Sequence, residues 1–107
     1  LMPVASVVMP SFNPGEFIRA SVSSVLNQSE RNLELIVIDD GSTDGSQDFI
    51  RRVAKVDPRV KFVQSNHQGA AAARSRAFAE LDPNSRFVSF IDADDCHEFN
   101  KLARQMQ

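Results

Sequence analysis

The segment at residues 88–96, VSFIDADDC, joins a β-prone apolar run to a group of carboxylates. Asp92, Asp94 and Asp95 fall within four positions at the end of that run. Like charges at this spacing repel one another unless a cation lies between them. Carboxylate oxygens are ligands that Mg²⁺ and Mn²⁺ prefer. The segment therefore predicts a divalent cation, Mn²⁺ or Mg²⁺, held by Asp94, Asp92 and Asp95.

The elements that must position these acids are predicted from apolar runs that alternate with helical patterns. Strands are expected at residues 5–9, 33–38, 60–64 and 86–91. These runs are continuously apolar, which is typical of strands buried on both faces of a parallel sheet. The order predicts an α/β layered domain of Rossmann-like type, a mostly parallel sheet with helices on both faces and right-handed crossovers.

Each expected helix has a recognisable start or stop. Asn13 is expected to cap the first helix, with Pro14 at its first position. Thr43 or Ser46 is expected to cap the second, which Pro58 ends. The third is expected from about Gly69 to the turn at residues 82–85, and residues 99–107 resemble the first turns of a fourth.

The polar clusters of the chain all follow predicted strands. The sequences PSFN, DDGSTD, QSNHQG and DADD stand at the carboxyl ends of the first to fourth strands. Ligands of open α/β sheets bind outside those ends. The expected edge therefore collects six acids, Asp39, Asp40, Asp44, Asp92, Asp94 and Asp95. Because Mg²⁺ usually combines one or two carboxylates with substrate phosphates, a nucleoside diphosphate is the expected ligand.

Composition excludes several other classes. The chain has 107 residues with a formal net charge of -2, so it lacks the basic surface that nucleic-acid binding requires. No apolar run approaches the ~20 residues of a membrane span, and the first residues lack the pattern of a signal peptide. The single cysteine, Cys96, excludes an internal disulfide. A cytoplasmic location is expected, with membrane-peripheral attachment of a longer protein left open.

Four segments, VVMPSFN, LIVIDDGSTDGS, NHQGAAAARSRA and FIDADD, resemble in order and spacing the motifs of family 2 inverting glycosyltransferases, which have the GT-A fold. The resemblance covers essentially the whole chain. It implies transfer of a sugar from a nucleoside-diphosphate sugar, with UDP as the default nucleotide, to an acceptor hydroxyl with inversion. It also implies a carbohydrate or lipid-linked acceptor.

The resemblance implies a role for each matching residue. Phe12 would stack on the base, with Pro10 and Asn13 in the same loop. Asp40 would accept a hydrogen bond from the base, while Asp39 would orient its loop. Further nucleotide contacts are implied for Asn66, Gly69, Arg74 and Asp92. Within the DxD motif, Asp94 would be the better metal ligand, Asp92 would lie nearer the ribose and Asp95 would be an additional acid.

The chain departs from the family in length, and in having Ser75 where Asn is common and CHEF after the DxD. Family members are usually well over twice as long, and their second half supplies the acceptor site and the general base. Residues 1–107 are therefore expected to be the nucleotide-sugar-binding part, with the base beyond residue 107. The isolated piece is expected to be inactive and to self-associate through its exposed apolar edge.

Other functions fit the residues less well. A dehalogenase-like phosphatase has its DxD after the first strand, and a receiver domain needs an aspartate after the third. A dinucleotide-binding domain needs G-x-G-x-x-G, which the four glycines do not form. Two alternatives stay open: a nucleotidyltransferase, which would have a Gly-rich basic loop in place of PSFNPGE, and a sugar-nucleotide-binding module without activity.

Overall fold

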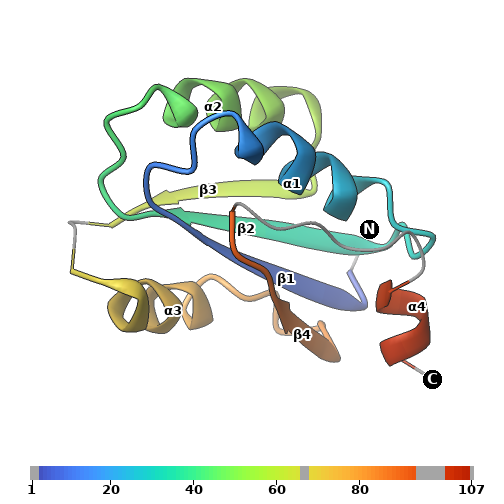
Figure 1. Ribbon diagram of the computed structural model, residues 1–107. Helices are drawn as coiled ribbons and strands as arrows, with labels where there is room; N and C mark the ends of the chain where they lie inside the picture. Colours follow the sequence, from blue (N-terminus) through green and yellow to red (C-terminus); the bar gives the residue numbers. More distant parts are fainter. Residues whose placement is uncertain (1–2, 66–67, 94–100, 107) are drawn as a thin grey trace.

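The computed structural model describes residues 3–65, 68–93 and 101–106. Strands and helices alternate along the chain (Figure 1). The strands are β1 (Ala5–Ser11), β2 (Leu33–Asp39), β3 (Val60–Gln64) and β4 (Phe87–Phe90). The helices are α1 (Phe17–Leu26), α2 (Ser46–Val56), α3 (Ala70–Phe78) and α4 (Lys101–Gln105). The predicted α/β order is confirmed.

The strands form one sheet in the order β3-β2-β1-β4, and every pairing is parallel. The register between β1 and β2 pairs Ala5 with Leu33 and Ser11 with Asp39, a constant separation of 28 residues (33 − 5 and 39 − 11). Figure 1 shows α1 and α2 on one face of the sheet and α3 on the other. The carboxyl ends of β1 and β2 therefore lie side by side.

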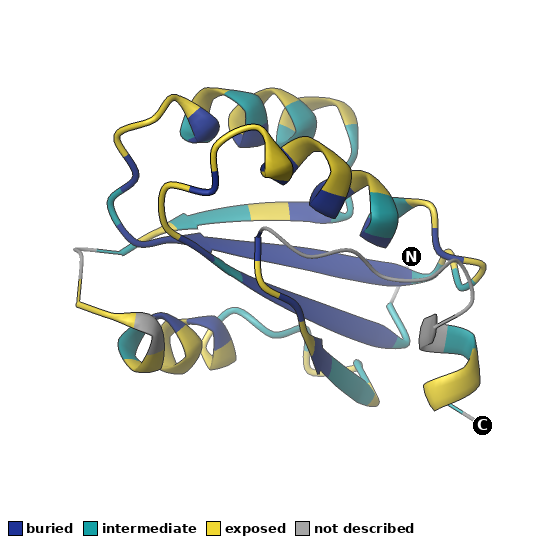
Figure 2. Ribbon diagram, in the orientation of Figure 1, coloured by how far each residue is buried: buried dark blue, intermediate teal, exposed yellow. Residues whose placement is uncertain are grey.

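The two central strands are buried on both faces, as their continuous apolar runs predict (Figure 2). Side chains alternate between faces along a strand. Val7 and Met9 of β1 pack with Ile18 and Val22 of α1 in one core. Val8, by contrast, packs with the α3 side of the sheet in a second, smaller core. Ala73 and Ala77 belong to that second core, so the alanine-rich helix lies close to the sheet.

The predicted helix caps are wrong. The helix α1 begins only at Phe17, its N-cap Glu16 makes no side-chain cap bond, and Asn13 has a φ of 46°, four residues before the helix. Ser46 is the first residue of α2 rather than its cap, and Gly45 at the cap position has no side chain to contribute. The Asn13 side chain bonds instead to Thr43 in the segment after β2, and the Ser46 hydroxyl bonds to Asp44.

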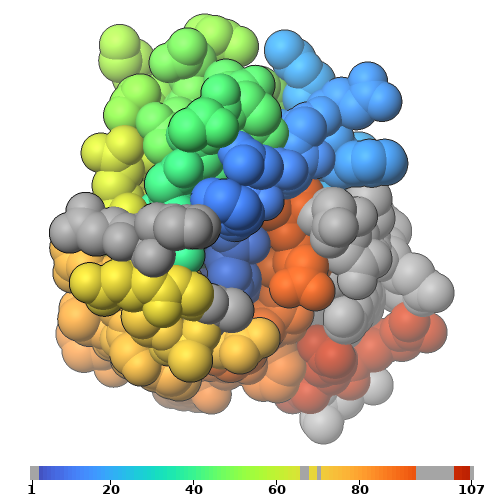
Figure 3. Space-filling view, turned by 60° about the vertical axis from the view of Figure 1, so that its left-hand side comes forward, coloured from blue at the N-terminus to red at the C-terminus, as the bar shows by residue number. Residues whose placement is uncertain are grey.

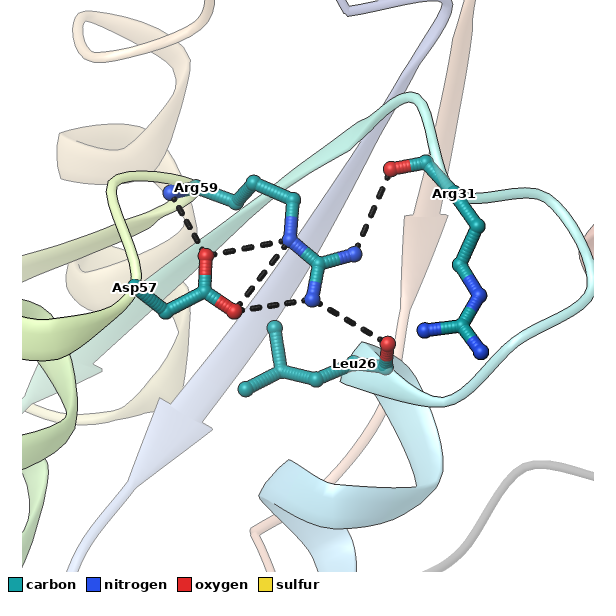
Figure 4. Close-up of polar contacts among 4 residues, drawn as sticks. All are labelled: Leu26, Arg31, Asp57 and Arg59. Carbon is teal, nitrogen blue, oxygen red and sulfur yellow. Dashed lines mark hydrogen bonds and ion pairs between the residues drawn. The ribbon is translucent and has the colours of Figure 1, made fainter.

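The end of the sheet away from the polar loops is fixed by Arg59 (Figure 4). Its guanidinium donates to both oxygens of Asp57, with the shortest contact at 2.8 Å, and to the carbonyl oxygens of Leu26 and Arg31 at 3.2 Å. Arg59 thus ties the end of α1 to the turn between α2 and β3. Its bonds to the carboxylate lower the pKa of Asp57 below the usual 3.8.

No helix within the described residues has the length and apolar character of a membrane span.

Candidate functional site

A cavity of about 480 Å³ opens at the carboxyl ends of the strands. Its lining comes from the end of β1 and the segment after it, the start of α1, the residue after β2, α3 and the residues after β4. The lining residues are Pro10, Ser11, Phe12, Asn13, Pro14, Phe17, Asp40, Ala73, Asp92 and Ala93. In Figure 3 the blue segment after β1 lies between the green segment after β2 and the orange end of β4. The predicted edge of the sheet is thus a concave site.

Asp39 and Asp40, the two consecutive acids of DDGS, point to opposite faces of the sheet, because side chains alternate between faces along a strand. Asp39 is fully buried on the α1/α2 side. Its Oδ2 accepts hydrogen bonds from the backbone N–H of Gly41 at 3.2 Å and of Ser42 at 3.0 Å, and from Gln47 Nε2 at 2.6 Å. Asp39 therefore holds the loop between β2 and α2, the orienting role expected for it.

Asp40 points to the α3 side and lines the cavity. Its Oδ1 accepts the backbone N–H of Gln68 at 2.9 Å, and its Oδ2 accepts that of Gly69 at 2.9 Å. Gly69 has a φ of 94°, which a residue with a side chain rarely adopts. Asp40 both fixes the loop before α3 and presents an acceptor to the cavity.

Asn13 lines the cavity, and its backbone N–H and side-chain Oδ1 both form hydrogen bonds within the protein. Its backbone N–H donates to Ser42 Oγ at 2.9 Å, and its Oδ1 accepts the backbone N–H of Thr43 at 2.8 Å. These contacts explain why Asn13 does not cap α1. They join the segment after β1 to the segment after β2.

Two exposed aromatic rings belong to the cavity lining. Phe12 is 51% exposed, so it is a surface residue of the site and not a core aromatic. Phe17, the first residue of α1, is 61% exposed. Sequence reasoning missed Phe17, although it falls outside the buried stripe of Ile18, Val22 and Val25 and is apolar at a helix start.

The other predicted site residues have different placements. Pro10 lines the cavity, as does Asp92, an exposed residue two positions after the end of β4. Arg74 is exposed on α3 and is not part of the described lining. Asn66, Asp94 and Asp95 lie outside the described residues, as do Cys96 and both histidines, so the structure tests none of them.

The metal site can be compared with the structure only through Asp92. Within the described residues no group of three or more Asp, Glu, His or Cys side chains is arranged to hold a metal ion. Two of the three predicted ligands, Asp94 and Asp95, lie outside those residues. Asp92 fits a ligand role because it is an exposed oxygen donor on the cavity wall.

Residues 6–107 match the family model described as Glycosyl transferase family 2. The chain belongs to glycosyl transferase family 2. This membership leaves the nucleotidyltransferase alternative without support.

Relatives and solved structures agree with the family assignment. The chain is 38% identical over 96% of its length to the UDP-Glc:alpha-D-GlcNAc-diphosphoundecaprenol beta-1,3-glucosyltransferase WfgD of Escherichia coli, of which it covers 40%. It is similar to the crystal structure of S. aureus TarS in complex with UDP-GlcNAc, with a TM-score of 0.83 and 25% identity, covering 95% of this chain and 30% of that one. It is also similar to the mannosyltransferase PcManGT from Pyrobaculum calidifontis in complex with GDP-Man and Mn2+, with a TM-score of 0.75 and 26% identity, covering 90% and 29%.

The family match confirms the predicted GT-A type of fold, since the four parallel strands and their helices correspond to part of the TarS structure. The chain spans between 13% and 42% of the length of the curated relatives it matches.

Proposed function

We propose that this chain is the donor-binding part of a glycosyltransferase that transfers a sugar from a nucleoside-diphosphate sugar, by default a UDP-sugar, to an acceptor hydroxyl with inversion. The observation that carries the proposal is the cavity that combines the exposed Phe12 ring with the Asp40 carboxylate. A flat aromatic face suits a nucleobase, and an anionic acceptor suits a ring N–H of uracil or guanine. The bound UDP-GlcNAc and GDP-Man of the two solved structures support a nucleoside-diphosphate ligand.

In this proposal different residues bind different parts of the nucleotide. Phe12 stacks on the base, Pro10 lies against it and Asp40 accepts its ring N–H. Asp92 binds on the phosphate or ribose side. Asn66, Gly69 and Arg74 complete the nucleotide site from the loop after β3 and from α3.

A divalent cation, Mn²⁺ or Mg²⁺, would be held by Asp94 together with Asp92 and Asp95. When bound, it would neutralise the charge of the leaving diphosphate as a Lewis acid. The Mn2+ named for the PcManGT complex supports a divalent cation.

Inverting transfer also needs a base that removes the proton of the acceptor hydroxyl. Within the described lining the ionisable groups are Asp40 and Asp92, and the proposal assigns both to the donor. The acceptor, a carbohydrate or a lipid-linked sugar, and its base are therefore proposed to bind in parts of the protein outside residues 1–107. The undecaprenol-linked acceptor named for WfgD supports a lipid-linked acceptor.

A ligand screen tests this function on the 107-residue chain. Thermal shift and calorimetry would compare UDP, GDP, dTDP and CMP, each with Mn²⁺ and with EDTA. We expect binding of one diphosphate that needs Mn²⁺, and its loss in Asp94→Ala without loss of the fold. Equal affinity with EDTA and with Mn²⁺ would refute the metal, and no binding of any nucleotide would refute the donor site. A coupled assay for released nucleoside diphosphate should show at most slow hydrolysis by this chain.

A further inference from the structure

The segments after β1 and β2 continue to run side by side after the sheet has ended. Within the sheet, paired residues are separated by 28 positions. Immediately beyond it the backbone N–H of Asp40 donates to the carbonyl oxygen of Ser11 at 2.9 Å, a separation of 29 positions. The extra position is the ordinary N–H-to-carbonyl offset beside a parallel pair such as Ser11 and Asp39, so this bond continues the regular pairing by one step.

Side chains take over the pairing from this point. Ser42 Oγ accepts the backbone N–H of Asn13 at 2.9 Å, and Asn13 Oδ1 accepts that of Thr43 at 2.8 Å. One step further, Asp44 Oδ2 accepts the backbone N–H of Gly15 at 2.7 Å. We call these three contacts, made by Asn13, Gly15, Ser42, Thr43 and Asp44, the loop ladder.

The loop ladder is anchored at both of its ends on the β2 side. The backbone N–H of Ser42 donates to the buried carboxylate of Asp39 at 3.0 Å. Asp44 Oδ1 accepts the backbone N–H of Ser46 at 3.0 Å and its hydroxyl at 2.7 Å, at the first turn of α2. The bond from the Ser46 hydroxyl is the main reason why the pKa of Asp44 is lowered. The segment after β2 is therefore a fixed frame to which the segment after β1 is attached.

The residue type at position 13 suits this attachment. Asn13 has a φ of 46°, in the left-handed region that asparagine enters more readily than most residues. Its short amide also places Oδ1 within reach of the opposite backbone. Phe12 lies between Ser11 and Asn13, both of which are bonded to the β2 side.

We propose that Asn13 and Ser42 are positioning residues, which hold the backbone on both sides of Phe12 so that its exposed ring faces the cavity before any ligand arrives. A site whose groups are already ordered loses less conformational entropy when a ligand binds. Asn13 then acts through Phe12 and not as a direct ligand of the nucleotide. The effect on nucleotide affinity rests on the proposed function, whereas the ordering of the ring does not.

The chain offers a clean reporter of that ordering. It contains no Trp and no Tyr, so Phe12→Trp places a single indole at the position in question. In this background the fluorescence anisotropy of the indole would be measured without nucleotide. Ser42→Ala and Thr43→Ala form a matched pair, because each removes one hydroxyl from neighbouring residues. Ser42→Ala removes the acceptor of the Asn13 N–H. Thr43→Ala removes only an exposed side chain, because Thr43 takes part in the loop ladder through its backbone N–H.

We expect Ser42→Ala and Asn13→Gly to lower the anisotropy, because nanosecond motion of the loop increases, and Thr43→Ala to leave it unchanged. Asn13→Gly keeps the left-handed backbone accessible and removes the side chain, including the Oδ1 that accepts the Thr43 N–H. Asn84→Gly, the same change in a remote turn, is its control and should have no effect. Circular dichroism would check that each variant is folded.

In the chain with Phe12 intact, Ser42→Ala should weaken nucleotide binding about 2- to 12-fold, the factor that corresponds to one hydrogen bond of about 0.5–1.5 kcal/mol. Anisotropy that is unchanged in both Ser42→Ala and Asn13→Gly, or reduced equally by Thr43→Ala, would overturn the proposal. If the anisotropies separate as expected while no nucleotide binds even to the parent chain, the positioning role stands and the donor-site proposal fails.

Discussion

Asp40 and Gly69 are separated by 29 positions (69 − 40), yet Asp40 Oδ2 accepts the backbone N–H of Gly69 at 2.9 Å. The other oxygen of the same carboxylate accepts the N–H of Gln68. One side chain at the end of β2 therefore fixes the loop that leads into α3. Any ligand that uses Asp40 binds to a carboxylate that the protein has already oriented.

Substitution Asp40→Asn should consequently affect the loop as well as the ligand. The amide NH2 would face the backbone N–H of Gln68 or Gly69, so one of the two bonds that hold this loop would be lost, at a cost of about 0.5–1.5 kcal/mol. We expect a lower melting temperature and weaker binding of every nucleotide tested. Urea denaturation and calorimetry would measure the two effects. Asp92→Asn, a change of the same type at an exposed lining residue, should leave stability unchanged; a stable Asp40→Asn that merely prefers another base would contradict this reasoning.

Phe12→Ala should separate binding from stability. The ring is 51% exposed, so its removal should change the free energy of unfolding little. Loss of an aromatic platform for a base costs about 1–3 kcal/mol of binding free energy. Calorimetry with the nucleotide found in the screen would measure this loss. Phe78→Ala removes an equally exposed ring, 57%, that does not line the cavity, and should leave affinity unchanged. Equal losses in both variants would contradict the stacking role.

The sequence predicted the parts of the fold that local patterns determine. The strand expected at residues 60–64 matches β3, and the strands expected at residues 5–9 and 33–38 lie within β1 and β2. Continuous apolar runs produced these predictions because a parallel sheet buries both faces of its strands. The helix starts failed for a non-local reason, since the Asn13 side chain binds Thr43, 30 positions away.

The site was predictable in outline because carboxyl ends of parallel strands meet at one edge. The different roles of Asp39 and Asp40 were expected from the family resemblance and not from a periodic pattern. What the sequence could not show is that both Asp40 oxygens bind the loop before α3, or that Asn13 binds protein groups. Those contacts depend on how far the loops extend after the sheet ends, which no periodic pattern records.

The ion pair between Asp57 and Arg59 should make stability depend on acid. The pKa of Asp57 is lowered chiefly by the hydrogen bonds from Arg59. The stabilisation is therefore present above the pKa of the unfolded chain, about 3.9, and is lost as the pH falls through the lower folded value. Asp57→Asn should reduce the free energy of unfolding at pH 7 by about 1–2 kcal/mol, and the difference from the parent should vanish in acid.

Urea denaturation from neutral pH into acid would measure this dependence. Asp48→Asn is a suitable control, because its pair with Arg51 is highly exposed, with 74% of the Asp48 side chain accessible, and such pairs contribute little. Nucleotide affinity should not change in Asp57→Asn, since Asp57 lies at the other end of the sheet from the cavity. A difference that persists below both pKa values would show that the ion pair is not its source.

The β4 edge should drive self-association of the 107-residue chain. Within the described sheet β4 pairs only with β1, so its other edge is open, and none of its four residues is charged. Phe90 is 42% exposed and lies edge-on to Phe78 at 6.1 Å between ring centroids. An uncharged, apolar edge strand is a template for pairing with a second chain.

Sedimentation velocity should therefore show an average mass that rises with concentration, and Phe90→Lys should reduce that rise by placing a charge on the edge. Val56→Lys adds the same charge at an 82% exposed residue of α2 and should leave the association intact. A chain that is monomeric at every concentration, or one whose association both lysine variants reduce equally, would exclude the β4 edge as the contact.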